Sequence, residues 1–346
     1  MFRSRLAAVA LAGATTAFLA GSAAAFDVKF ATYVPPAHGA AKFFETTLKD
    51  IAARSNGGIT LTYLPGAQLG PPPKYYDMAK SGQADITWFL HGNTPGVFPL
   101  TEVGTVPLLM GSAEIGTKVL NDPALRDKYL AKEHVGVHII NLHTHQPANV
   151  YTAKKAIRTV DDFKRMRLRV PSGPVRDLAI ALGATPDGMP ATEWVEGLQK
   201  GTIDGVFTDY GGAGIAFRIG PVVKFGTELY FYVGTFCLCI NERIYGRLPV
   251  NVRKDLDDTF AAKMPQSGIE FDKLDDIGKK TMMGEGMQPV TMPPEEMRKF
   301  RTVVEKIANE AVETTQKKGV PAREVYALMK TLSEKHAKTS RNFWTH

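Results

Sequence analysis

Apolar and polar positions alternate along the chain with two periods, one typical of strands and one typical of helices. Residues 27–31 are predicted to form a first strand, and residues 40–54 a helix, because their apolar side chains recur at helical spacing. The cycle continues in further strands expected at 59–64, 84–90, 135–142, 167–170 and 203–207. This alternation predicts an α/β fold with open, parallel sheets. The last third differs, since residues 253–286 and 294–334 are almost all helical in pattern.

The loops that follow the predicted strands are where a ligand would bind. In open α/β sheets, ligands lie beyond the carboxyl ends of the strands. Two such domains that face each other across a cleft would bring several of these loops to one place. The sequence therefore predicts an interdomain ligand cleft formed by the loops at 32–38, 90–96, 143–149, 170–174 and 207–214.

The N-terminal segment 1–25 has the plan of a secretory signal peptide. Arg3 and Arg5 precede an apolar run rich in Ala and Leu, and Ala23 and Ala25 occupy the −3 and −1 positions of a small-residue cleavage site. An N-terminal membrane anchor is the alternative, but the apolar run is short for a membrane span. We therefore expect cleavage near Ala25 and a mature chain of about two domains.

Charge and composition exclude several classes of partner. The formal net charge is +7 at neutral pH, but the basic residues are scattered along the chain. A nucleic-acid-binding surface would show a clustered basic stripe with interleaved aromatic residues, and the sequence has none. No later stretch is long and apolar enough to cross a membrane, so we expect a protein that is not itself membrane-embedded.

Cys237 and Cys239 lie two residues apart in an apolar run. On a strand, both side chains would point to the same face. Neighbours this close rarely have disulfide geometry, and a metal or redox site would need partners at recognisable spacing. We expect two small, buried apolar residues.

Motifs for catalysis and for cofactor binding are missing from the sequence. It has no nucleophile elbow, no zinc-protease helix and no Gly-Lys-Ser/Thr phosphate loop. His143 and His145 lie two apart, but they have no acidic neighbours that would complete a metal site. We therefore predict a protein that has no cofactor and is not an enzyme.

If the segment 165–170 is extended as a strand, it carries three arginines on one face and apolar residues on the other. Arg169 lies at its carboxyl end, next to Pro171, where ligands bind. Its planar guanidinium can hold a carboxylate through two parallel hydrogen bonds. An exposed or ion-paired arginine is the alternative, and we expect that arrangement for Arg165 and Arg167.

Several motifs together resemble the solute receptors of tripartite ATP-independent periplasmic (TRAP) transporters, of the DctP type. Leu64–Gly70 is similar to the family's Pro-Gly-Gly-Gln-Leu-Gly turn, and Ser81–Ile86 to its Gly-x-x-Asp strand entry. Leu168–Pro171, Leu182–Trp194 and Leu198–Gly205 are similar to its most specific region, in the same order and spacing. The resemblance runs from about residue 28 to 335.

The resemblance implies two α/β domains that close around a ligand through a hinge of crossing strands. The expected division is 26–147 with about 235–275 for the first domain, and 148–234 with about 276–346 for the second. It further implies a periplasmic location, a small organic carboxylate as ligand, TRAP membrane subunits as partners, and Arg169 as the residue that grips the carboxylate.

Some positions depart from the family pattern and indicate the ligand class. Many relatives carry a second Arg at the position of Asn149 and an Asn at the position of Thr208. An acidic pocket residue of a relative corresponds to Leu90 here, and the position two before Glu193 is Ala191. One fixed cation and apolar walls remain. The hypothesis is therefore a monocarboxylate with an apolar or aromatic body, bound by Arg169 with Asn149 and Thr208.

Further candidate binding residues surround these positions. Apolar surface is expected from Trp88, Phe89, Leu90 and Phe236, and further contacts from Tyr33, Trp194, Asp209 and His91. Two other functions use the same cleft. A periplasmic enzyme would need Asp209, His91 or His145 as a base, and a ligand sensor would dock to a signalling receptor instead of a transporter.

Overall fold

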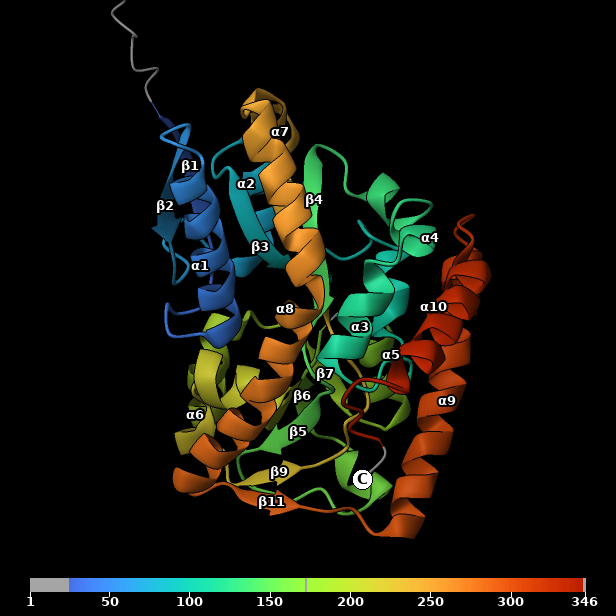
Figure 1. Ribbon diagram of the computed structural model, residues 1–346. Helices are drawn as coiled ribbons and strands as arrows, with labels where there is room; N and C mark the ends of the chain where they lie inside the picture. The colour runs from blue at the N-terminus through green and yellow to red at the C-terminus, as the bar shows by residue number, and fades with distance from the viewer. Residues whose placement is uncertain (1–24, 172, 345–346) are drawn as a thin grey trace, which may run out of the picture.

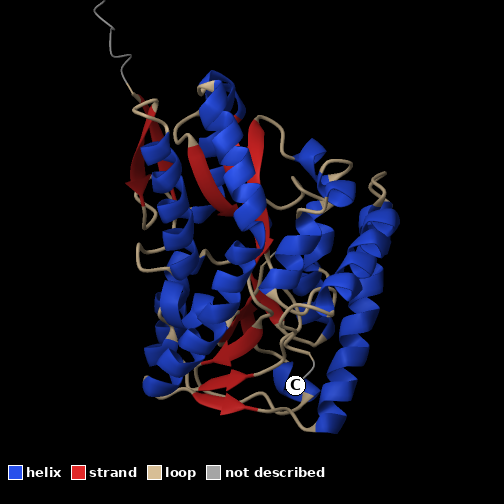
Figure 2. Ribbon diagram, viewed as in Figure 1, coloured by secondary structure: helices blue, strands red, loops and turns tan. Residues whose placement is uncertain are grey.

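The computed structural model describes residues 25–171 and 173–344. The predicted signal peptide lies almost entirely outside these residues. Two β-sheets lie one above the other in Figure 1, and the long helix α8 runs diagonally past both of them. Figure 2 shows that helices flank both sheets, which confirms the predicted α/β class.

The first sheet has the strand order β2-β1-β3-β10-β4. Its strands are β1 (Phe26–Ala31), β2 (Ile59–Leu64), β3 (Ile86–Leu90), β4 (Val137–Thr144) and β10 (Thr235–Asn241). β1 runs parallel to β2 and β3, whereas β10 is antiparallel to both β3 and β4. The chain returns from the second sheet to form β10, so this strand enters from the opposite direction.

The second sheet has the strand order β11-β9-β5-β8-β6-β7. Its strands are β5 (Asn149–Thr152), β6 (Arg167–Arg169), β7 (Thr185–Asp187), β8 (Gly205–Thr208), β9 (Phe225–Thr227) and β11 (Gln288–Val290). β6 is parallel to β7 and β8, but β5 is antiparallel to β8 and β9. The prediction of purely parallel sheets is therefore wrong, because each sheet contains a strand that follows a crossover from the other.

The helices follow the predicted pattern with two breaks. They are α1 (Gly39–Arg54), α2 (Tyr75–Ser81), α3 (Ala113–Leu120), α4 (Pro123–Arg126), α5 (Pro174–Ala181), α6 (Trp194–Lys200), α7 (Glu242–Arg247), α8 (Val250–Gly284), α9 (Pro294–Gln316) and α10 (Ala322–Ala337). The helical stretch formed by α3 and α4 is interrupted where Asp122 caps a new helix that starts at Pro123. The helix expected at 294–334 is broken near Gly319, which has a φ of 85°.

Three stretches of chain connect the two sheets. Residues 145–148 lead from β4 to β5, residues 228–234 lead from β9 to β10, and α8 packs against elements at both levels. α9 packs on α5, whereas α10 packs on α3 beside the first sheet. The division of the chain into two domains at the boundaries given above stays a prediction.

The two cysteines of β10 depart from the expectation. Both are fully buried, as expected, but their sulfur atoms form a disulfide. The pairing of β10 with β4 shifts register between Leu238 and Cys239, and the Cα atoms of the two cysteines lie 5.6 Å apart. This distance is within the normal range for a disulfide, so the expectation of two unpaired cysteines is wrong.

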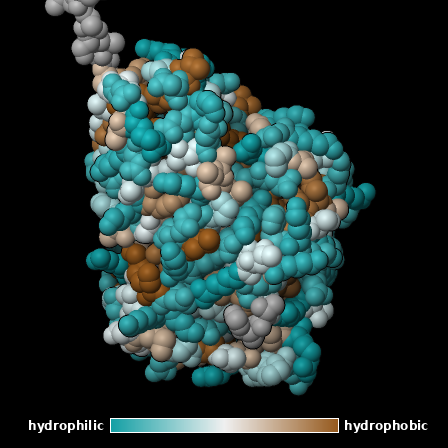
Figure 3. Space-filling model, in the orientation of Figure 1, coloured by the Kyte–Doolittle hydropathy of each residue, from teal (hydrophilic) through white to brown (hydrophobic). Residues whose placement is uncertain are grey.

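The surface in Figure 3 is mostly hydrophilic, with small and scattered hydrophobic patches. Within residues 25–171 and 173–344, no helix combines the length and apolarity that a membrane crossing needs.

Candidate functional site

A cavity lies where the two sheets meet, and every one of the predicted ligand loops contributes to its wall. Tyr33 and His38 come from the first loop, Leu90 and Asn93 from the second, and His145 from the third. The remaining two loops supply Pro171 and, from 207–214, Thr208, Asp209 and Gly212. The empty space is about 660 Å³ when its open mouth is included.

Arg169 ends β6 and lines this cavity while remaining only 7% exposed. Its Nε donates to the carbonyl oxygen of Met189 at 3.1 Å, and its guanidinium carbon lies 4.5 Å from the centre of the Trp194 ring. The carboxylate of Asp187 accepts the Met189 N–H at 2.7 Å and so fixes the turn that carries this carbonyl. The guanidinium therefore has a defined position in the wall.

The charge of Arg169 faces the cavity without a carboxylate partner in the described part of the chain. Burial lowers the pKa of the guanidinium to about 10, which still leaves it protonated at neutral pH. Arg167, two residues earlier, is different because its side chain donates to both carboxylate oxygens of Asp204. The expectation of an ion-paired Arg167 is thus confirmed, and Arg169 is the arginine left with its charge available.

Aromatic rings form a second part of the wall. The Tyr33 and Trp88 rings are parallel, with centroids 5.7 Å apart, and Phe236 stacks on Trp88 at 5.3 Å. His38, which caps α1, and Phe271 of α8 complete this surface. Burial lowers the pKa of His38 to about 4, so at neutral pH this ring adds no positive charge. The result is an aromatic, largely apolar wall.

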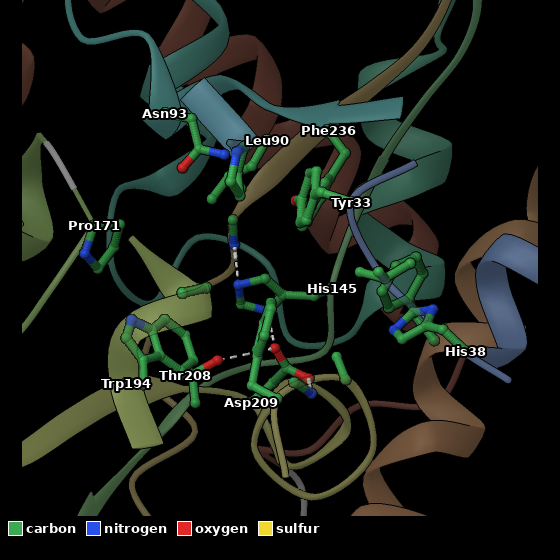
Figure 4. Close-up of a pocket in the computed structure, with 18 of the residues that line it drawn as sticks. Tyr33, His38, Leu90, Asn93, His145, Pro171, Trp194, Thr208, Asp209 and Phe236 are labelled. Carbon is green, nitrogen blue, oxygen red and sulfur yellow. Dashed lines mark hydrogen bonds and ion pairs between the residues drawn. The ribbon is translucent and has the colours of Figure 1, made fainter. Parts of the chain in front are cut away.

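Polar groups gather on β8 and the loop after it. Asp209 is 5% exposed, and its Oδ1 accepts the Gly212 N–H at 2.7 Å. Its Oδ2 lies 3.6 Å from Nδ1 of His145 and 3.5 Å from Oγ1 of Thr208. Nε2 of His145 accepts the Gly234 N–H at 2.8 Å. Figure 4 shows these groups between Trp194 on one side and Tyr33 and Phe236 on the other.

Most of the predicted binding residues line the cavity. They are Tyr33, Trp88, Leu90, Arg169, Ala191, Trp194, Thr208, Asp209 and Phe236. Their contribution to ligand binding stays a prediction.

The structure places three other predicted residues outside the lining. The carboxamide oxygen of Asn149 accepts the N–H groups of Leu229 and Tyr230, so it holds the return crossover. Phe89 lies on the opposite face of β3 from Trp88 and packs on Tyr76 and Phe98. Neither side chain therefore lines the cavity.

His91 is the third predicted residue that does not reach the cavity. It is fully buried, with Nδ1 at 2.7 Å from the carbonyl oxygen of Thr235 and Nε2 at 2.9 Å from Nε2 of His134. Burial holds the pKa of His91 well below its usual range. Its loop contributes Leu90 and Asn93 to the wall instead.

Sequence reasoning missed several lining residues, among them His38, Phe217, Tyr232 and Phe271. His38 belongs to a loop that the pattern had already indicated, and its capping position could have identified it. Phe217, Tyr232 and Phe271 had no such signal, because they come from an irregular segment, a crossover and the middle of α8. Within the described residues, no cluster of His, Cys, Asp and Glu side chains is arranged to hold a metal ion.

Solved structures of similar sequence and fold are solute-binding proteins. A TRAP solute-binding protein from Rhodoferax ferrireducens T118, in complex with copurified benzoate, is 26% identical, with a TM-score of 0.85 over 91% of this chain and 99% of its own. One from a marine metagenome, specific for aromatic acid ligands and bound to 3-hydroxybenzoate, is 25% identical, with a TM-score of 0.85 over 90% and 99%.

Sequence comparison leads to the same family. The C4-dicarboxylate-binding periplasmic protein DctP of Rhodobacter capsulatus is 27% identical over 73% of this chain and 77% of its own. The model of the DctP family, bacterial extracellular solute-binding proteins of family 7, matches residues 30–315. These relatives are binding proteins and not enzymes. The chain therefore belongs to the DctP family and is a solute-binding protein of the TRAP type.

Proposed function

We propose that this protein captures a monocarboxylate with an aromatic body in the periplasm and delivers it to a TRAP membrane transporter. The observation that carries the proposal is the guanidinium of Arg169, which faces the cavity beside an aromatic wall and has no carboxylate partner in the described residues. A ligand carboxylate would supply the ion-pair partner of Arg169.

The chemistry of the wall supports one carboxylate and a planar apolar body. Arg169 is the only lysine or arginine among the described lining residues. A planar guanidinium can bind a carboxylate in a bidentate manner, and the pair gains strength in a site that excludes water. The stacked rings of Tyr33 and Trp88 offer a face or an edge to an aromatic ring.

The relatives support this class without deciding it. The two solved structures named above, at 25% and 26% identity, hold aromatic acids. The DctP relative, at 27% identity, is named for C4-dicarboxylates. The absence of a second arginine or lysine from the described wall favours the aromatic monocarboxylate for this chain.

Capture is proposed to work by closure of the two sheet-bearing halves around the ligand. The crossovers at 145–148 and 228–234 lie directly at the cavity, where His145, Tyr232 and Gly234 line it. A ligand that contacts both halves favours the closed state by its additional contacts there. The predicted signal peptide at 1–25 and the family together support the periplasmic location.

The test is to identify the ligand and compare its chemical class with others. Native mass spectrometry of the protein from its own host should reveal a copurified aromatic acid. Calorimetry should then show that benzoate binds at least about 100-fold more tightly than succinate, because a second carboxylate finds no cation in the wall. Tight succinate binding with no detectable binding of any aromatic acid would overturn the proposal.

A further inference from the structure

We infer that Asp209 forms a second subsite in this cavity, which binds a hydrogen-bond donor on the ligand and rejects a second carboxylate. The inference rests on the proposed function and deepens it. It narrows the substrate class to aromatic monocarboxylates that carry a hydroxyl or amino group.

The carboxylate of Asp209 has a fixed position. Its Oδ1 accepts the Gly212 N–H at 2.7 Å, and its main-chain carbonyl accepts the Ala213 N–H at 2.9 Å. A Cβ atom on Gly212 would lie 2.8 Å from Oγ1 of Thr208 and 3.0 Å from Oδ2 of Asp209. Glycine at this position therefore leaves the space that the two side chains need, which gives a role to the glycine-rich run after β8.

No cationic side chain neutralises Asp209 within the described chain. Among the residues that the structure describes, only His145 lies within ion-pair distance, with its Nδ1 at 3.6 Å from Oδ2. Nε2 of His145 accepts the Gly234 N–H, so it carries no proton. With a proton on Nδ1 alone, the ring is neutral and that proton is shared with the carbonyl of Gln146. The negative charge of Asp209 therefore remains in the wall.

Oδ2 retains capacity to accept a hydrogen bond. Its contacts with Thr208 and His145, at 3.5 and 3.6 Å, are at or beyond the limit for such bonds, whereas Oδ1 is well satisfied. A carboxylate oxygen can accept more than one hydrogen bond. An O–H or N–H group of a bound ligand would therefore find an acceptor here.

The two charges of the wall consequently select different ends of a ligand. Arg169 attracts one carboxylate, and Asp209 attracts a donor and repels an anion. Repulsion between like charges is strong in a buried site because little water screens it. A dicarboxylate would be excluded by this repulsion as well as by the lack of a second cation.

The test compares benzoate with hydroxy-, amino-, methoxy- and carboxybenzoates, each at the ortho, meta and para positions, by calorimetry. The best hydroxy or amino probe should bind at least about tenfold more tightly than its methoxy counterpart, which accepts but cannot donate. Each benzenedicarboxylate should bind at least about 100-fold more weakly than benzoate.

Asp209→Asn removes the charge but keeps the oxygen that accepts the Gly212 N–H. In this variant, the ratio of the affinity for benzoate to the affinity for a benzenedicarboxylate should fall at least about tenfold. Asp85→Asn is the matched control, because Asp85 is also buried and accepts a backbone N–H, from Lys29, but does not line the cavity. Asp85→Asn should leave the ratios between the ligand affinities as they are in the wild-type protein.

The outcomes separate the two proposals. If benzoate binds but a benzenedicarboxylate binds equally well, or if Asp209→Asn changes no ratio while remaining folded by circular dichroism, the inference is overturned and the proposed function stands. If neither benzoate nor any substituted benzoate binds the wild-type protein, the proposed function fails together with the inference.

Discussion

The side chains of Arg169 and Trp194 donate to the same carbonyl oxygen, that of Met189, and the guanidinium carbon lies 4.5 Å from the centre of the indole ring. The ring and the carbonyl together hold the guanidinium in place before a ligand arrives. A side chain that is already ordered loses less entropy on binding, so this arrangement should increase affinity.

Replacing Trp194 should weaken binding by releasing Arg169. We expect Trp194→Leu to lower the affinity for benzoate about tenfold, because the cation–π contact is lost. Trp194→Phe retains a ring face and should restore most of the affinity. Calorimetry gives the affinities, and the thermal midpoint distinguishes this positioning role from a general loss of structure. Wild-type affinity in Trp194→Leu would refute the role.

The stack of Tyr33 on Trp88 should confer preference for flat ligands. We expect Tyr33→Leu to weaken benzoate binding about three- to tenfold, since an aromatic contact is replaced by an aliphatic one. Binding of cyclohexanecarboxylate, which has the same carboxylate on a non-planar ring, should change much less. An equal change for both probes would show that Tyr33 does not read planarity.

Close packing of α8 on the loop after β8 should make Gly278 essential for stability. A Cβ at Gly278 would lie 2.1 Å from the carbonyl oxygen of Tyr210. We expect Gly278→Ala to lower the free energy of unfolding by at least about 2 kcal/mol. Gly284 of the same helix has open space around it and is the control; Gly284→Ala should leave stability unchanged or raise it. Urea denaturation measures the free energy of unfolding of both variants. Similar values for the two would contradict the close packing at Gly278.

Asp275 should make stability decrease as pH rises. Burial raises the pKa of this carboxyl to about 8, so the native state holds the proton more tightly than the unfolded chain, and ionisation between about pH 4 and pH 8 destabilises the fold. We expect Asp275→Asn to become more stable than wild type as pH rises from 5 to 8, by on the order of 2 kcal/mol.

The control for this prediction is the neighbouring residue. Asp276 is largely exposed, and a hydrogen bond from Arg341 holds the pKa of its carboxyl below the usual range. Asp276→Asn should therefore show no relative gain at high pH. Urea denaturation at several pH values decides the matter, and parallel curves for Asp275→Asn and wild type would refute the assignment.

The sequence was sufficient to locate the cavity and its central arginine. Every loop identified by the rule that ligands lie beyond the carboxyl ends of strands contributes to the wall, although the crossover at 228–234 and other segments line it as well. Pro171 marks the end of the predicted strand, so local pattern places Arg169 near the predicted cleft. The choice of Arg169 over an exposed or ion-paired arginine came from the resemblance to the family.

The errors arose from contacts between distant parts of the chain. Strand alternation separates Trp88 from Phe89, but it does not say which of the two faces a cavity. The backbone N–H groups that donate to the carboxamide oxygen of Asn149 belong to Leu229 and Tyr230, which lie 80 and 81 residues away in the sequence. β10 is antiparallel to β3 because the chain crosses back from the second sheet before it forms this strand. The spacing of apolar residues does not reveal the direction of such a crossover.

The most direct test of the account is to measure benzoate binding to variants of Arg169 by calorimetry. Arg169→Ala should abolish detectable binding, and Arg169→Lys, which keeps the charge but loses the planar fork, should bind at least about 100-fold more weakly than wild type. Arg167→Lys, on the same strand but paired with Asp204, should bind normally. Wild-type affinity in a folded Arg169→Ala protein would contradict the central claim.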